Sequence, residues 1–232
     1  MSHFSIKEAL AGVKRTRAEV PNQRKALLPH HLHAINQQLH TVSSRYRQAF
    51  WTACLLAFHT LVRSANLFAD SKKKSPKHLT LQSIVPTSDG FIINFPALKN
   101  ERFLNKTVAI PITRLTNDSA LCAATALQRS IDGRTDKHGP LLTYKKNKRD
   151  VALTAAKFNL TLRDVLRRAG FNASRFSVHS FRRGAATFAS QSGISEDSLK
   201  AQGNWKSECY TRYICRDFDL RQEFATSLST SL

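Results

Sequence analysis

Residues 177–215 read SVHSFRRGAATFASQSGISEDSLKAQGNWKSECYTRYIC, and three short polar motifs occur in this stretch. His179 and Arg182 are three residues apart, so a helix would place their side chains on the same side of one turn. Trp205 and Tyr213 follow, eight residues apart. Any one of these motifs is common in basic or helical proteins, so the information lies in their order and spacing.

The segment upstream of Arg63 predicts a buried helix. Apolar residues repeat at helical spacing from Phe50 to Leu61, and others stand beside them, so the helix is apolar nearly all round. We expect it to begin near Ser43 or Ser44, to lie in the core and to bring Arg63 to its C-terminal end.

A β-type pattern interrupts the helical one in the middle of the chain. The segments 79–85, 91–95 and 107–112 are short and rich in β-branched and aromatic residues, and 88–90 form a tight-turn sequence, Ser-Asp-Gly. We expect a three-stranded antiparallel sheet, with Lys99 in the loop between its second and third strands.

Helical patterns account for most of the remaining chain, so the expected fold class is mainly α with a small three-stranded antiparallel β-sheet. Gly170 is expected just beyond the end of one helix, where a left-handed conformation is common. A polar loop is expected from Gly133 to Asp150. The other expected helices are 5–18, 29–40, 121–131, 158–169, 180–192, 196–202 and 207–213.

Together the polar residues resemble the active-site set of the tyrosine recombinases, also called the phage integrase family. The resemblance covers roughly residues 27–216, and every polar position of the set is filled in order. The set consists of Arg63, Lys99, His179, Arg182, Trp205 and Tyr213. It implies the tyrosine recombinase catalytic-domain fold for residues 27–232. It also implies cleavage and rejoining of DNA strands with no metal ion and no cofactor.

The resemblance implies a role for each residue. Tyr213 is the nucleophile that forms a 3′-phosphotyrosyl bond, with His179 as candidate base and Lys99 as general acid for the 5′-oxygen. The two arginines hold the non-bridging phosphate oxygens and stand in for the metal ions of other phosphoryl-transfer enzymes. Trp205 donates its indole N–H to a phosphate oxygen.

Two of these assignments have competitors within the sequence. Tyr210 lies three residues before Tyr213 on the same side of the expected helix, but the spacing from the tryptophan and the isoleucine that follows favour Tyr213. Arg183 competes with Arg182, and the spacing from the histidine favours Arg182. We expect Arg183 and Lys206 to contact DNA instead.

Two features depart from the family pattern. Many members carry an acidic residue three places after the first arginine, whereas this chain has Asn66, which accepts a hydrogen bond but brings no charge. The family also has an N-terminal core-binding domain that closes around DNA. Residues 1–26 look like a helix and linker left from such a domain.

Longer runs around the motifs look like one branch of the family, the recombinases of eukaryotic DIRS-like retrotransposons. The runs are 178–187, 203–207 and 213–214. This likeness implies a mobile-element protein that recombines or integrates DNA in a nucleus. In an organism without a nucleus, the expected location is the cytoplasm.

The charge balance agrees with a nucleic-acid partner. Lys and Arg number 36 against 16 Asp and Glu, a formal net charge of +20 at pH 7. A basic excess of this size favours a polyanion such as double-stranded DNA, because each neutralised phosphate releases counterions. A ribosomal or otherwise non-specifically basic protein is the alternative on charge alone.

Other classes are disfavoured. The longest apolar run is too short to cross a bilayer and the first residues lack the apolar core of a signal peptide, so we expect a soluble protein that is not secreted. The four cysteines contain no CxxC pair, and Cys54 and Cys122 are expected to be buried. The cluster His30, His31, His33 and His40 lacks partner ligands at metal-site spacing.

Three functions remain open at this point. The first is a recombinase or integrase that is a monomer when free and a tetramer on DNA. The residues after Tyr213, with Leu220 and Phe224 on one helix face, are expected to pass to a neighbouring subunit or to fold back on their own domain. The second is a type IB topoisomerase-like enzyme. The third is a domesticated or inactive DNA-binding protein.

Overall fold

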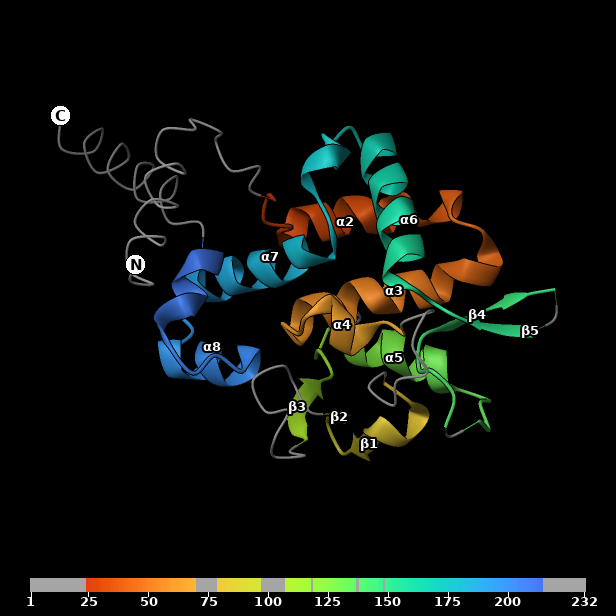
Figure 1. Ribbon diagram of the computed structural model, residues 1–232, viewed down its shortest axis with the longest axis horizontal. Helices are drawn as coiled ribbons and strands as arrows, with labels where there is room; N and C mark the ends of the chain where they lie inside the picture. Colours follow the sequence, from red (N-terminus) through yellow and green to blue (C-terminus); the bar gives the residue numbers. More distant parts are fainter. Residues whose placement is uncertain are drawn as a thin grey trace, which may run out of the picture.

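The computed structural model describes residues 24–69, 79–96, 107–117, 119–136, 138–147 and 149–214. Helices surround a central helix, α3, and a small sheet lies to one side of it (Figure 1). The helices are α2 (Pro29–Gln37), α3 (Ser44–His59), α4 (Ser64–Leu67), α5 (Ala123–Ile131), α6 (Ala155–Arg168), α7 (Val178–Gln191) and α8 (Glu196–Gly203). The 3-10 helices are η1 (Leu39–Thr41), η2 (Leu81–Ser83), η4 (Ala173–Arg175) and η5 (Glu208–Tyr213). The expected fold class is confirmed.

Helix α3 forms the centre of the core, as its nearly continuous apolar pattern predicts. Phe50, Cys54, Leu55 and Leu56 are fully buried, and the helix packs against α5, α7 and the strand β4 (Thr143–Lys146). A helix that is apolar on all sides needs neighbours on all sides, which explains its place.

The prediction that this helix reaches Arg63 is wrong. It ends at His59, and Thr60 hydrogen-bonds back through Oγ1 to the carbonyl of Leu56 at 2.6 Å. Leu61 then has a φ of 51°, a left-handed conformation that cannot continue a right-handed helix. Arg63 therefore stands after a sharp break in the chain, as the residue that precedes α4.

The three-stranded antiparallel sheet is confirmed, with β1 (Ile84–Thr87), β2 (Gly90–Phe95) and β3 (Val108–Thr113) in the order β1-β2-β3. The turn at residues 88–89 joins the first two strands. The prediction of strand from residue 79 is wrong, because 81–83 form the 3-10 helix η2. An added Cβ on Gly90 would lie 2.1 Å from the Ile112 carbonyl oxygen, so the strand pairing itself requires glycine there.

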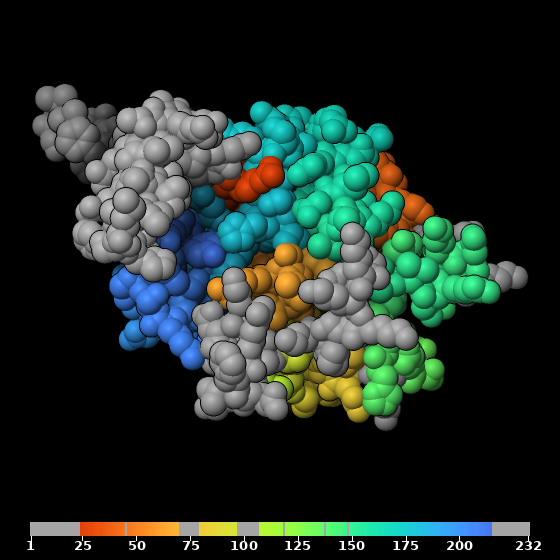
Figure 2. Space-filling view, in the orientation of Figure 1, coloured from red at the N-terminus to blue at the C-terminus, as the bar shows by residue number. Residues whose placement is uncertain are grey.

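A second sheet replaces part of the expected polar loop. Strands β4 and β5 (Arg149–Ala152) form an antiparallel hairpin at the end of the molecule opposite α8 (Figure 1 and Figure 2). Asn147 has a φ of 49° in the turn, a conformation that asparagine tolerates. Lysines and arginines in both strands hide the alternation by which strands are recognised.

The C-terminal helices agree with the sequence to within a few residues. Helix α6 ends at Arg168, and Gly170 follows with a φ of 83°, as expected for a residue just past a helix end. Helices α7 and α8 and the short η5 follow in order. The expected helix at 5–18 and the tail after Ile214 lie outside the described residues. Among the described helices, none has the length and apolar character needed to cross a membrane.

The chain that leads into α2 lies directly on α7. The backbone N–H of Leu27 donates to the Ser180 carbonyl at 2.9 Å. A Cβ added to Gly184 would lie 1.8 Å from the Leu27 carbonyl oxygen, so α7 needs glycine at this point of contact.

Candidate active site

Helix α7 presents the first pair of predicted site residues. Ser177 and Ser180 form a reciprocal cap at its start, with the Ser177 N–H donating to Ser180 Oγ at 3.1 Å. His179 is exposed in the first turn, while Arg182 is 2% exposed in the next. The helix thus places the histidine at the surface and the arginine beneath it.

The guanidinium of Arg182 joins two distant parts of the chain. It donates to the Leu61 carbonyl at the break after α3, and to the Gly203 carbonyl at the end of α8 with Nη2 at 2.8 Å. A guanidinium has five N–H donors, so three remain after these bonds. Its buried Nε finds no acceptor in the described part of the protein.

Trp205 lies on the same guanidinium. The Arg182 Cζ is 4.1 Å from the centroid of the indole, which is 5% exposed. The ring packs so closely on Gly203 that an added Cβ there would lie 2.0 Å from the indole Cζ3. The indole Nε1 is also a buried donor without a partner among the described residues.

Tyr213 completes this cluster. Its ring is half-buried, with centroid distances of 5.2 Å to both the His179 and the Trp205 rings. The Arg182 Cζ is 5.2 Å from its centroid. Thr187 Oγ1 donates to its backbone carbonyl at 3.2 Å, which ties η5 to α7.

Tyr210 has a different environment. Its side chain is 1% exposed, and its ring lies 6.3 Å from the Trp205 ring. Hydrogen bonding with Glu196, together with desolvation, raises the pKa of Tyr210 to about 12. A buried phenol with a raised pKa is a poor nucleophile, so the surroundings favour Tyr213 for that role.

The site is strongly positive. Partial desolvation lowers the pKa of His179, and the charges of Arg182, Arg183 and Arg63 lower it further. Burial lowers the pKa of Arg182 to about 10, so it remains charged at neutral pH. A neutral imidazole beside fixed positive charges can accept a proton while the arginines attract an anion.

The six predicted residues are brought together to different extents. His179, Arg182, Trp205 and Tyr213 are in contact, and Arg63 is close enough that its charge acts on two of them. Lys99 lies outside the described residues.

The remaining candidates lie around the cluster. Asn66 is buried in α4, one turn after Arg63. Arg183 Nη1 donates to the Arg24 carbonyl at 3.3 Å, which makes it part of the contact between α7 and the preceding chain. Lys206 is exposed beside Trp205.

Three residues of this arrangement escaped the sequence reasoning. Leu61 supplies a carbonyl for Arg182, Gly203 supplies another carbonyl and room for the indole, and Thr187 fixes the Tyr213 backbone. Only Gly203 had a visible signal, as a glycine at the end of a helix, two residues before the tryptophan.

The described residues contain no cluster of three or more potential metal ligands. His31, one member of the histidine cluster, is buried against the rings of Phe171 and Phe176 at 4.7 and 5.1 Å. Desolvation lowers its pKa to about 4, as for a histidine in a hydrophobic core.

Comparison with known proteins finds similarity in sequence and in fold, although no protein-family model matches the chain. An integrase/recombinase, a xerD homolog of Selenomonas ruminantium, is 28% identical over 142 residues, which are 59% of this chain and 41% of the relative. The chain therefore spans less than half the length of that relative.

Solved structures share the fold. The XerA recombinase superposes with a TM-score of 0.61 at 17% identity, over 89% of this chain and 66% of that one. The Tn1549 transposon integrase in complex with circular intermediate DNA gives 0.57 at 13%, over 91% and 68%. The fold is that of the tyrosine recombinase catalytic domain.

Proposed function

Because this chain has the tyrosine recombinase fold and resembles an integrase/recombinase in sequence, we propose that it belongs to that family and cleaves and rejoins DNA strands through Tyr213. One observation carries the proposal. Two buried donors, Arg182 Nε and Trp205 Nε1, have no partner in the described part of the chain and lie beside a tyrosine in a positive site. Buried donors almost always have a partner, and a phosphate oxygen is the acceptor that suits both.

The cleavage step follows from these positions. The Tyr213 oxygen attacks the phosphorus and forms a 3′-phosphotyrosyl bond, while the bond from phosphorus to the 5′-oxygen breaks. His179, neutral because its pKa is lowered, takes the phenolic proton. Lys99 supplies a proton to the departing 5′-oxygen. Arg182 and Arg63 offset the charge that develops on the non-bridging oxygens.

Rejoining is the reverse of this step. A 5′-hydroxyl of the same or another strand attacks the phosphotyrosyl bond, and the tyrosine recovers its proton. The number of phosphoester bonds is unchanged, so the reaction needs no external energy source. The two arginines provide the positive charge that metal ions provide elsewhere, and we propose that no metal is required.

The proposed substrate is double-stranded DNA, with Arg183 and Lys206 among its backbone contacts. The net charge of +20 supports it, as does the transposon integrase that shares the fold. We also propose that the protein serves a mobile element, in the nucleus if its host is a eukaryote. The domain division at residue 27 and the likeness to DIRS-like recombinases remain predictions.

The test is to trap the covalent intermediate on a nicked suicide substrate, from which the cleaved strand end diffuses away. The wild-type chain should form a denaturant-stable protein–DNA adduct, and Tyr213→Phe should form none while still binding DNA. The matched control is Tyr210→Phe, which should retain the adduct if it folds. An adduct in Tyr213→Phe and none in Tyr210→Phe would reverse the assignment. No adduct in the wild type would favour the non-catalytic alternative.

Recombination needs strand exchange between two duplexes, which a single site cannot perform. We propose a monomer in free solution and a tetramer on paired sites, held by the segment after Ile214, which lies outside the described residues. Deletion of 217–232 should leave single-site binding intact and reduce assembly. Sedimentation on DNA with one and with two sites measures both effects. Unchanged assembly of the truncated protein would exclude this role, and relaxation of supercoiled DNA by a monomer would favour a topoisomerase.

A further inference from the structure

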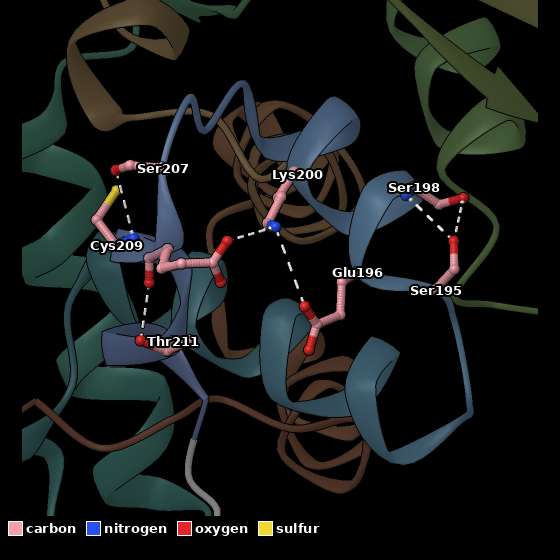
Figure 3. Close-up of polar contacts among 8 residues, drawn as sticks. Ser195, Glu196, Ser198, Lys200, Ser207, Cys209 and Thr211 are labelled. Carbon is pink, nitrogen blue, oxygen red and sulfur yellow. Dashed lines mark hydrogen bonds and ion pairs between the residues drawn. The ribbon is translucent and has the colours of Figure 1, made fainter.

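An exposed ion pair links the end of α8 to the start of η5, the 3-10 helix that carries Tyr213. Figure 3 shows the Lys200 ammonium between two carboxylates. Its Nζ is 2.6 Å from Glu208 Oε1 and 4.0 Å from Glu196 Oε2. Glu208 is the first residue of η5, and Lys200 lies in the last turn of α8.

The lysine also covers the ring that anchors η5. Its Nζ is 5.1 Å from the centroid of Tyr210, which is buried against Trp205. The Lys200 backbone carbonyl accepts a hydrogen bond from the Trp205 N–H at 2.9 Å. One residue therefore contacts the indole segment through its backbone and η5 through its side chain.

The pairing of Lys200 with Glu208 favours the charged form of both side chains. Hydrogen bonding to Glu208 raises the pKa of Lys200, and hydrogen bonding to Lys200 lowers the pKa of Glu208. Both groups therefore stay charged at neutral pH. At its other end, η5 is tied to α7 by the bond from Thr187 to the Tyr213 carbonyl. The 3-10 helix is thus held at its first and last residues.

We infer that Lys200 and Glu208 are positioning residues, which hold η5 so that the Tyr213 phenol stays beside Arg182 and Trp205. The inference rests on the proposed role of Tyr213 as nucleophile. Neither residue is among the groups proposed to hold the reacting phosphate. They act by raising the fraction of molecules in which the tyrosine is in place, because a short 3-10 helix has few hydrogen bonds of its own.

The expected effect is small but specific. Exposed ion pairs contribute little to global stability, and Glu208 is 70% exposed, so the loss of one pair shifts a local equilibrium by about threefold. Small displacements of a nucleophile reduce reaction rates strongly, whereas DNA binding does not require the tyrosine to be in place. The cleavage rate should therefore change while DNA affinity does not.

The experiment compares Glu208→Gln with Asp164→Asn in the full chain. Asp164 is also exposed and pairs with Arg168 at 3.0 Å, but it lies on α6, away from η5. Single-turnover adduct formation on the suicide substrate gives the rate, and titration at fixed salt gives the DNA affinity. Hydrogen exchange of the amides of 208–214 reports directly on the order of η5. Lys200→Met and the double variant complete a cycle with Glu208→Gln.

In Glu208→Gln and in Lys200→Met we expect about threefold slower cleavage and about threefold faster amide exchange. The double variant should cleave no more slowly than either single variant. Asp164→Asn should match the wild type in both measurements. The inference is overturned if Glu208→Gln has the same exchange and cleavage rates as Asp164→Asn. It is also overturned if the losses of cleavage rate in the two single variants add up in the double variant. If the wild type forms no adduct, the proposed function fails, and the exchange rates alone decide whether the pair holds η5.

Discussion

The Arg182 guanidinium lies 4.1 Å above the indole ring of Trp205, and the same arginine bonds the backbone on both sides of the site. A cation over an aromatic face is attracted by the ring, and the contact fixes both groups. Each leaves one buried N–H without a partner among the described residues. The pair thus forms a rigid platform of donors whose direction is set before any substrate binds.

Removal of the indole N–H alone should separate the two roles of Trp205, as a ring packed on Arg182 and as a hydrogen-bond donor. Trp205→Phe keeps an aromatic ring over Arg182 but removes the indole N–H, so cleavage should slow by about tenfold to a hundredfold, as expected for a lost hydrogen bond to a charged group. Trp51→Phe, in the core of α3, is the control and should leave the rate unchanged. Single-turnover adduct formation checks this, and equal rates in the two variants would contradict a role for the N–H.

A methyl group at residue 203 should displace the indole. Because a Cβ would lie 2.0 Å from the ring, Gly203→Ala must move Trp205 and with it the contact to Arg182. We expect a loss of about 1–3 kcal/mol in the free energy of unfolding and a larger loss of cleavage rate than of DNA affinity. Ala201→Ser, at an exposed position of the same helix, should behave as the wild type. Urea unfolding and adduct formation measure the two effects.

The cleavage rate should be retained into mildly acidic solution. The pKa of His179 is lowered from 6.5, so its neutral, proton-accepting form persists below that pH. The rate should fall only when the pH drops through this lowered value, and the midpoint of the acid limb should therefore lie below 6.5. A pH profile of single-turnover cleavage tests this, with His179→Gln as the variant in which that limb disappears. A midpoint above 6.5 would show that another group accepts the proton.

Cleavage should survive removal of divalent metal. If Arg63 and Arg182 supply the positive charge at the phosphate, adduct formation in EDTA should match that in magnesium within about twofold, allowing for the salt dependence of DNA binding. Arg182→Lys should be far less active, because a compact ammonium lacks the planar fork by which the guanidinium reaches two separate carbonyls and still presents N–H groups to a phosphate. Loss of cleavage in EDTA with rescue by magnesium would indicate a metal-dependent nuclease mechanism.

The parts that were predictable share a physical cause. Helix α3 could be predicted because an entirely buried helix must be apolar all round. The sheet could be predicted because β2 is rich in β-branched and aromatic residues and follows a tight-turn sequence. The hairpin β4–β5 was missed because its basic side chains face solvent. The break at Leu61 was missed because a left-handed leucine leaves no mark in the sequence.

The candidate site came from a different kind of information. No periodicity relates Arg63 to Arg182, and only the family resemblance linked them before the structure placed both near His179. The acceptors that hold Arg182 could not be predicted, because Leu61 and Gly203 act through carbonyl oxygens, which every residue has. Their contribution depends on where the chain turns.

The contact between Gly184 and the Leu27 carbonyl has a mechanical consequence. With no side chain between the two backbones, the segment around Leu27 lies in direct contact with α7. Lys25 N–H also donates to the Arg175 carbonyl at 2.9 Å, just before this helix begins. A displacement of Lys25 or Leu27 would therefore reach α7 at Ser180, the residue after His179, through backbone contacts rather than through a series of side chains.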